Sequence, residues 1–137
     1  MLSLRMLRWP DDRESLSSLD TSFTTDRIYR VVATNLSFVL HDIPIAPALH
    51  KDYQFADHVE SLPALDYVVV AEVDAILAGV AALKVEAWNR RAVLWHLYIG
   101  QAYRRHGIGR ALIDTVMRAA QEREARCLWL ETQNING

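Results

Sequence analysis

The sequence predicts an α/β (α+β) fold around one mixed central sheet, in which an antiparallel meander leads into a β-α-β unit and helices cover both faces. Three observations predict this class. β-branched runs at 67–73, 76–85 and 92–99 are separated by short polar turns, as in antiparallel strands. Apolar residues then recur at helical spacing over 108–119. A last apolar run at 127–131 follows that helix, so its strand is expected to lie parallel to the run at 92–99.

Composition and charge favour a single folded domain over residues 1–137. Hydrophobic residues make up 51% of the chain and charged residues 23%, which is ordinary for a globular protein. The formal net charge of -2 provides no field that would attract nucleic acid or an anionic membrane, so neither is expected as a partner. No apolar stretch reaches the ~18 residues of a membrane span.

Cysteine usage excludes two classes of site. The single cysteine, Cys127, excludes an internal disulfide and a cysteine-rich zinc site, and we expect no bound metal. Because Cys127 lies in an apolar run, we expect a buried, inert thiol. One free cysteine fits a reducing compartment, so we expect a cytoplasmic protein.

The first half of the chain gives weaker signals. Residues 11–20 have helix-like spacing, and 28–40 mixes β-branched and aromatic residues, which predicts strands with a turn near Asn35. Two prolines then predict a surface loop over 44–53, and a short helix is expected at 55–62.

The run at 92–99 is expected to be a strand with both faces partly covered. Asp74-Ala75 is expected to join the first two strands of the meander, and Asn89–Arg91 the second and third. Strict alternation puts Val93, Trp95, Leu97 and Ile99 on one face of the third strand, and Leu94, His96 and Tyr98 on the other.

A glycine loop, Arg104-Arg105-His106-Gly107-Ile108-Gly109, joins this strand to the predicted helix. Backbone N–H groups in the first turn of a helix lack partners within the helix, and the helix dipole makes that end positive. A diphosphate would supply the missing acceptors. Gly107 and Gly109 let it approach the backbone, while Arg104 and Arg105 add positive charge. The loop lacks the Gly-Lys-Ser/Thr of a P-loop, and the alternative is an ordinary turn with solvated arginines.

The spacing Arg104-X-X-Gly107-X-Gly109 resembles the Gln/Arg-X-X-Gly-X-Gly/Ala signature of the GNAT superfamily of N-acetyltransferases, over about residues 66–134. Within it, 87–97 and 127–134 are similar to the streptothricin acetyltransferases. The resemblance implies a GNAT-like form of the predicted sheet and an acyltransferase that uses acetyl-CoA. It also implies a primary amine of a small molecule as acceptor, and resistance to a streptothricin-type antibiotic as the role.

The resemblance also implies the cofactor site. The strand backbone around Leu97 to Ile99 would hold the pantetheine arm and polarise the thioester carbonyl, and the loop backbone would hold the pyrophosphate. Asn134 matches a position that often faces cofactor or substrate. The predicted cofactor-binding residues are Leu97, Tyr98, Ile99, Arg104, Arg105, His106, Gly107, Ile108, Gly109, Arg110 and Asn134.

A general base is required because an ammonium group has no lone pair with which to attack. Relatives often carry a Glu where this chain has Val93. The candidates that remain are His96, Tyr98 and Glu86, with Glu72 and Glu131 nearby. The alternatives are a hydrogen-bonded structural role for His96, a solvated carboxylate at Glu86, and packing roles for Trp88 and Trp95.

A GNAT domain normally continues past the strand at 127–131 with a helix and two strands, which include the tyrosine that commonly protonates the departing thiolate. The sequence stops at Gly137, so the resemblance implies a C-terminally truncated domain and identifies no general acid. The strand at 127–131 would expose an unpaired edge, and we expect a homodimer through it or a fragment of a longer product. The alternative function is a catalytically weak or inactive CoA-binding protein.

Overall fold

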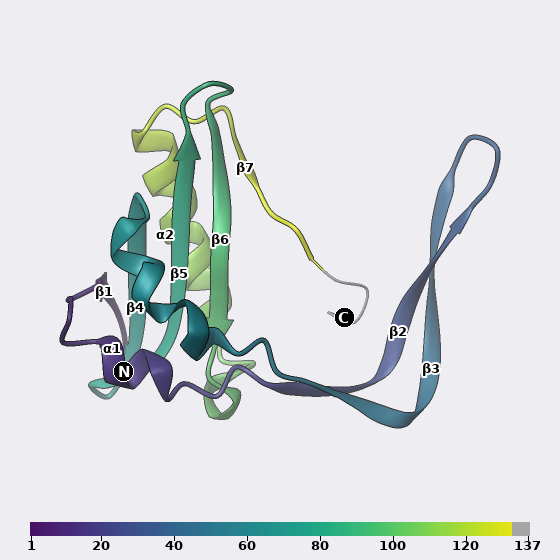
Figure 1. Cartoon of the computed structure of the whole chain (residues 1–137), viewed down its shortest axis with the longest axis horizontal. Coiled ribbons are helices and arrows are strands. Elements are labelled where there is room, and N and C mark those ends of the chain that lie inside the picture. Colours follow the sequence, from purple (N-terminus) through teal and green to yellow (C-terminus); the bar gives the residue numbers. More distant parts are fainter. Residues whose placement is uncertain (133–137) are drawn as a thin grey trace. The chain divides into compact units, whose positions relative to one another are not determined.

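Five strands form a mixed sheet in the order β1-β4-β5-β6-β7 (Figure 1). Their bounds are Leu2–Met6 (β1), Tyr67–Val73 (β4), Ile76–Glu86 (β5), Arg91–Ile99 (β6) and Cys127–Trp129 (β7). Neighbouring strands are antiparallel, except that β6 and β7 are parallel. The α+β class, the antiparallel meander and the β-α-β unit are therefore confirmed.

The computed structural model describes residues 1–132, which fall into two units. The first unit contains residues 1–21 and 54–130, and with them the whole five-stranded sheet. The second contains residues 22–53, together with 131 and 132.

Local sequence explains the meander, although not its outer strand. Asp74 and Ala75 have φ angles of 51° and 67° and form the predicted tight turn between β4 and β5. The sequence pattern does not predict β1, which pairs with β4 from Leu2 opposite Val73 to Met6 opposite Val69. A five-residue strand carries too little alternation to be separated from a loop.

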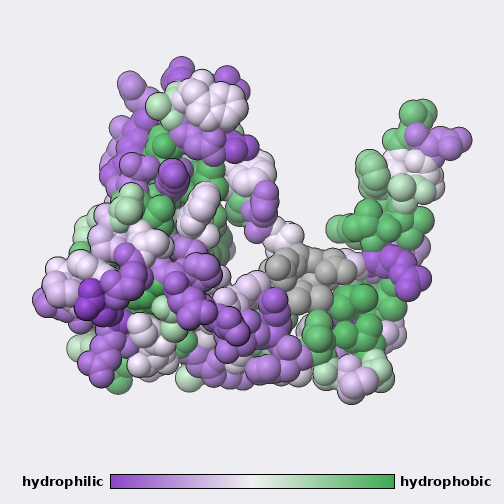
Figure 2. Space-filling model, viewed as in Figure 1, coloured by the Kyte–Doolittle hydropathy of each residue, from purple (hydrophilic) through white to green (hydrophobic). Residues whose placement is uncertain are grey.

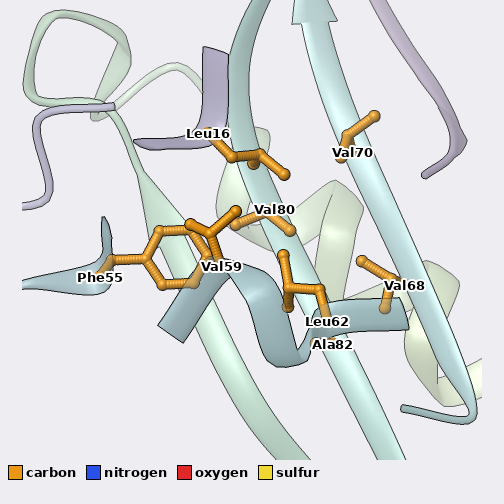
Figure 3. Packing of buried hydrophobic residues seen from close by; sticks show 8 residues of the cluster. All are labelled: Leu16, Phe55, Val59, Leu62, Val68, Val70, Val80 and Ala82. Carbon is orange, nitrogen blue, oxygen red and sulfur yellow. The ribbon is translucent and has the colours of Figure 1, made fainter. Parts of the chain in front are cut away.

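One face of the sheet is covered by α1 (Arg13–Ser17) and by the 3₁₀ helix η1 (Phe55–Ala64). The side chains buried between these helices and the sheet are shown in Figure 3: Leu16, Phe55, Val59, Leu62, Val68, Val70, Val80 and Ala82. Burying a side chain of this kind stabilises the fold by roughly 1.5–3 kcal/mol. The helices predicted near 11–20 and 55–62 are both present.

The opposite face of the sheet is covered by α2 (Ile108–Glu122), whose Ile108, Leu112 and Val116 pack on β4 and β5. A short 3₁₀ helix, η2 (Gln101–Tyr103), lies between β6 and α2. Helices thus lie on both faces of the sheet, as predicted. None of the helices in residues 1–132 is long and apolar enough to cross a membrane.

The second unit is a two-stranded antiparallel ribbon of β2 (Phe23–Ala33) and β3 (Phe38–Lys51). The prediction of a loop over 44–53 is wrong, because β3 continues through both of its prolines. Pro47 lies where the register shifts and pairing is interrupted, and Pro44 lies in a strand with one partner only. Proline is tolerated at such positions, where the missing N–H removes no ladder bond. Apolar side chains gather on this ribbon in Figure 2, among them Phe38, which is 78% exposed.

The predicted burial of Cys127 is also wrong, because this residue is exposed. Its neighbour Leu128 packs against the α2 side of the sheet, so alternation along the edge strand β7 turns Cys127 and Trp129 the other way. An apolar run at the end of a sheet need not be buried on both faces.

Candidate active site

The first turn of α2 presents backbone donors without acceptors. The first hydrogen bond of the helix runs from the Ala111 N–H to the Gly107 carbonyl. Within residues 1–132, the N–H groups of Ile108, Gly109 and Arg110 have no acceptor, and no side chain caps the helix. The first turn contains no acidic residue. This helix end is therefore open to an anionic group from outside the chain.

The glycines keep the space above this helix end clear. A Cβ added at Gly109 would meet no atom of residues 1–132 within 4 Å. The same holds at Gly107, but Gly107 also has a φ of +80°, which L-residues rarely adopt. The tight turn therefore requires glycine at 107, whereas the protein itself would tolerate a methyl group at 109.

Arginine side chains surround the loop, and one of them ties it to β6. The Arg104 Nε donates a hydrogen bond to the Ile99 carbonyl at 3.1 Å. His106 Nδ1 lies 3.2 Å from the Tyr103 carbonyl oxygen. Arg105 and Arg110 are exposed, and neither forms an ion pair within the described chain. Two exposed positive charges therefore flank the open helix end.

The edge of β6 towards β7 is unpaired over most of its length. β7 pairs only with Arg91, Ala92 and Val93, and the two strands then diverge (Figure 1). From Leu94 to Ile99, β6 has no partner strand on this side within residues 1–132. Its free backbone donors and acceptors lead towards the glycine loop. Leu97, Tyr98 and Ile99 and loop residues 104–110 are thus brought together at one end of the sheet.

A β-bulge at Trp95 corrects the predicted alternation of β6. On β5, Ala82 pairs with His96 and the next residue, Leu83, pairs with Leu94. Trp95 is therefore the extra residue on β6. Leu94, Leu97 and Ile99 consequently share the α2 side, while Tyr98 packs with the cluster on the other side. Strict alternation fails here because one residue has no partner.

His96 lies on the face covered by η1 and is only 9% exposed. Its ring contacts those of Phe55, His58 and Tyr98, with centroid distances of 5.4, 5.9 and 5.9 Å. Its Nε2 atom is enclosed and has no hydrogen-bond partner in the described chain. Burial, with a smaller effect from the charge of His58, lowers the pKa of His96 to about 4. The imidazole is therefore neutral at pH 7, and a fully hydrogen-bonded structural role does not fit its Nε2.

The candidate carboxylates are already engaged or lie in the other unit. Glu86 accepts hydrogen bonds from Arg91 at 2.9 Å and from the Trp88 indole at 3.0 Å, and Arg91 holds the pKa of Glu86 below its usual value. Glu72 accepts a 2.5 Å bond from Arg5 at the β1–β4 pair. Glu131 belongs to the second unit. His96 differs from these carboxylates, because it is buried and its Nε2 has no hydrogen-bond partner in the described chain.

Trp88, Trp95 and Asn134 are the remaining positions that the sequence singles out. Trp88 is 82% exposed and Trp95 is 52% exposed, so their interpretation as packing residues is wrong. Asn134 lies outside the described residues. No group of three His, Cys, Asp or Glu residues in the described part of the chain could hold a metal ion.

His58, which lies on η1 and contacts His96, is not among the predicted site residues. Nothing in the local pattern marks it, because η1 is a 3₁₀ helix and the contact joins distant parts of the chain. Only the docking of η1 on the sheet brings the two imidazoles together.

Comparison with known proteins identifies the family. Residues 33–136 match the acetyltransferase (GNAT) family model. The chain is 35% identical to the streptothricin acetyltransferase of Streptomyces lavendulae, covering 93% of this chain and 71% of that protein. The chain belongs to the GNAT acetyltransferase family. This confirms the predictions of family, of an acyltransferase and of acetyl-CoA as the family's acyl donor.

Solved structures agree with this GNAT fold. The structure of a nourseothricin acetyltransferase superposes with a TM-score of 0.83 at 36% identity, over 99% of this chain and 76% of that one. A Bacillus anthracis protein in complex with acetyl coenzyme A superposes with a TM-score of 0.79 at 23% identity, over 99% and 75% of the two chains. The second match bears on the fold alone.

Proposed function

We propose that residues 1–137 act as one GNAT domain that transfers the acetyl group of acetyl-CoA to a primary amine of a streptothricin-type antibiotic. The observation that carries this proposal is the open first turn of α2, from Gly107 to Arg110, beside the unpaired edge of β6. The streptothricin and nourseothricin acetyltransferases, at 35% and 36% identity, support the choice of acceptor.

In this proposal each part of the site has one task. The N–H groups of Ile108, Gly109 and Arg110 bind the pyrophosphate oxygens, and Arg105 and Arg110 add charge. The free edge of β6 between Leu97 and Ile99 hydrogen-bonds the amide groups of the pantetheine arm. A backbone N–H of that edge polarises the thioester carbonyl, as the donors of an oxyanion hole do. Acetyl-CoA supplies the activated acetyl group.

Calorimetric titration with acetyl-CoA tests the cofactor site. Replacement of Arg104 and Arg105 by alanine is expected to weaken binding at least tenfold, which corresponds to about 1.4 kcal/mol. Arg118→Ala is the control, because Arg118 is an exposed arginine on α2 that lies beyond the first turn of that helix. Equal affinity of the double variant and the parent would remove the site assignment.

The second candidate is a CoA-binding protein with little or no turnover. The paired state of Glu86 and Glu72 favours it, because neither carboxylate is free to act as a base. Release of free CoA thiol on addition of streptothricin supports the transferase. Tight acetyl-CoA binding without thiol release supports the binding protein.

We also propose a homodimer formed through β7, in the cytoplasm. β7 is an edge strand within the described residues, and Trp129 and Leu130 are 37% and 49% exposed. A second copy would pair with the free backbone groups of this edge and cover both side chains. Sedimentation of the parent and of a Trp129→Lys variant tests it. A parent that remains monomeric at high concentration would contradict it.

A further inference from the structure

The environment of His96 leaves one polar atom without a partner. The side chain is only 9% exposed, and its Nε2 is enclosed without a hydrogen bond to any described residue. An orphaned buried polar atom of this kind destabilises a fold. Because Nε2 is enclosed, the packing around the ring must open before a water molecule or a bound amine pairs with it, and that contact would offset the cost.

His96 also lies next to the proposed reaction centre. It stands in the middle of the unpaired stretch of β6 from Leu94 to Ile99, directly before Leu97. The Trp95 bulge precedes it, and its ring lies on the face opposite α2, against Phe55 and His58 of η1. An acceptor that reached the thioester from the η1 side would meet this imidazole.

The neighbouring histidine connects His96 to solvent. The imidazoles of His58 and His96 are in contact, with 5.9 Å between their ring centroids. His58 is exposed, whereas His96 is buried. The pair therefore joins the buried ring to the protein surface.

We propose that His96 takes the proton released by the attacking amine and that His58 passes it to solvent. This proposal rests on the function proposed above. The neutral amine forms a C–N bond to the thioester carbonyl carbon, and the carbonyl π electrons move to oxygen. The nitrogen then carries a positive charge and gives one N–H proton to His96. As the carbonyl re-forms, the C–S bond breaks and CoA leaves as a thiolate, which takes a proton from solvent.

The weak basicity of His96 suits this order of events. Burial holds its pKa at about 4, so it would not deprotonate a free ammonium group of pKa ~10. After the C–N bond has formed, the nitrogen proton is far more acidic, and a neutral imidazole can accept it. The titratable groups that face the ring are His58 from η1 and Tyr98 from β6, while Phe55 and the opposing Ala82 carry no charge.

Kinetics of a His58→Ala variant test the relay. We expect kcat to fall about tenfold, with the loss recovered as free imidazole is added, because imidazole replaces the missing proton carrier. Imidazole is expected to have no effect on the parent. His41→Ala, which removes an exposed histidine on β3, is expected to keep the parental response. An unchanged kcat for His58→Ala, or a loss that imidazole does not restore, would overturn the relay.

An NMR titration of the imidazoles supplies a readout without turnover. In the parent, His96 is expected to titrate far below 6.5, and His58→Ala is expected to move its midpoint upwards, because a neighbouring charge is removed. A His96 midpoint of 6.5 that is the same in the parent and in His58→Ala would overturn the proposal. If the parent releases no thiol with any amine tested, the proposed function itself fails. If the parent turns over and only the relay tests fail, the proposed function stands.

Discussion

Asp12 and His96 are both buried polar side chains of the first unit, with 6% and 9% of their surface exposed. Asp12 accepts two hydrogen bonds of 2.8 Å from Arg5 and one of 2.7 Å from the Arg8 N–H. His96 Nε2 has no partner in the described chain. The Arg5 guanidinium holds the pKa of Asp12 below its usual value, whereas burial lowers that of His96.

Asp12 has the hydrogen bonds of a structural polar group, whereas His96 lacks a hydrogen bond that a ligand would supply. Arg5 also donates to Glu72, so the guanidinium links β1 and β4 to the segment that precedes α1. Each charge in that network faces an opposite charge at hydrogen-bonding distance, so burial stabilises the pairing. A buried polar group without a partner destabilises the fold instead, and it persists in a site where an external group binds.

Breaking the paired network should give the largest loss of stability. Asp12→Ala leaves Arg5 with Glu72 and the Met6 carbonyl as partners, and we expect the free energy of unfolding to fall by about 3 kcal/mol. Urea denaturation at pH 7 measures this loss. Asp11→Ala, which removes the exposed neighbouring carboxylate, should change the free energy of unfolding by less than about 0.5 kcal/mol. Equal losses from the two variants would mean that the network is not structural.

The orphaned histidine should dominate the pH dependence of stability between pH 6.5 and about 4. The unfolded state binds this proton more tightly, because the pKa of His96 is 6.5 when unfolded and about 4 when folded. Stability is therefore complete above pH 6.5 and decreases as pH falls towards 4, by about 3 kcal/mol. His96→Phe should flatten this window. Asp12 acts at lower pH, since its contribution is lost only below its unfolded value of 3.8.

A substitution in the first turn of α2 should change stability and acetyl-CoA affinity in opposite directions. Gly109→Ala adds a methyl group with no atom of the described chain within 4 Å, so it should stabilise the helix by roughly 0.5–1 kcal/mol. In the proposed function the same methyl group would lie where the pyrophosphate approaches, and we expect acetyl-CoA affinity to fall about tenfold. Thermal unfolding and calorimetry measure the two effects. Gly107→Ala is the contrasting variant, because its φ of +80° should make it destabilising.

A surface ion pair should give the smallest effect. Arg13 and Glu60 lie 2.7 Å apart, but their side chains are 50% and 67% exposed. Water and salt screen such a pair, so Glu60→Gln should change the free energy of unfolding by less than about 1 kcal/mol. Urea denaturation at low and high salt measures it. A loss as large as that of Asp12→Ala would show that burial is not what distinguishes the two networks.

Elements with strong local patterns could be predicted from the sequence. The turn at Asp74 and Ala75 fixes the β4–β5 hairpin, and the helical spacing from Ile108 to Ala119 fixes the buried face of α2. The glycine loop could be placed between β6 and α2 for the same reason. Its predicted cofactor contacts stay predictions, as do those of Asn134.

Features that depend on distant parts of the chain could not be predicted. β1 exists because it pairs with β4, and β3 continues through Pro47 because pairing with β2 is interrupted there. The contact of His58 with His96 arises only when η1 packs on the sheet. Each of these features is decided by a partner strand or helix, and local propensity carries no information about that partner.

The bulge at Trp95 has a consequence for how the length of this strand can vary. Deleting Trp95 would leave Leu94 and His96 on opposite faces of β6, as they are now, and would remove only the local bend. Deleting a regularly paired residue would turn all the side chains beyond it to the wrong face of the sheet. Trp95 is thus a position where the gene could lose one codon without inverting the rest of the strand.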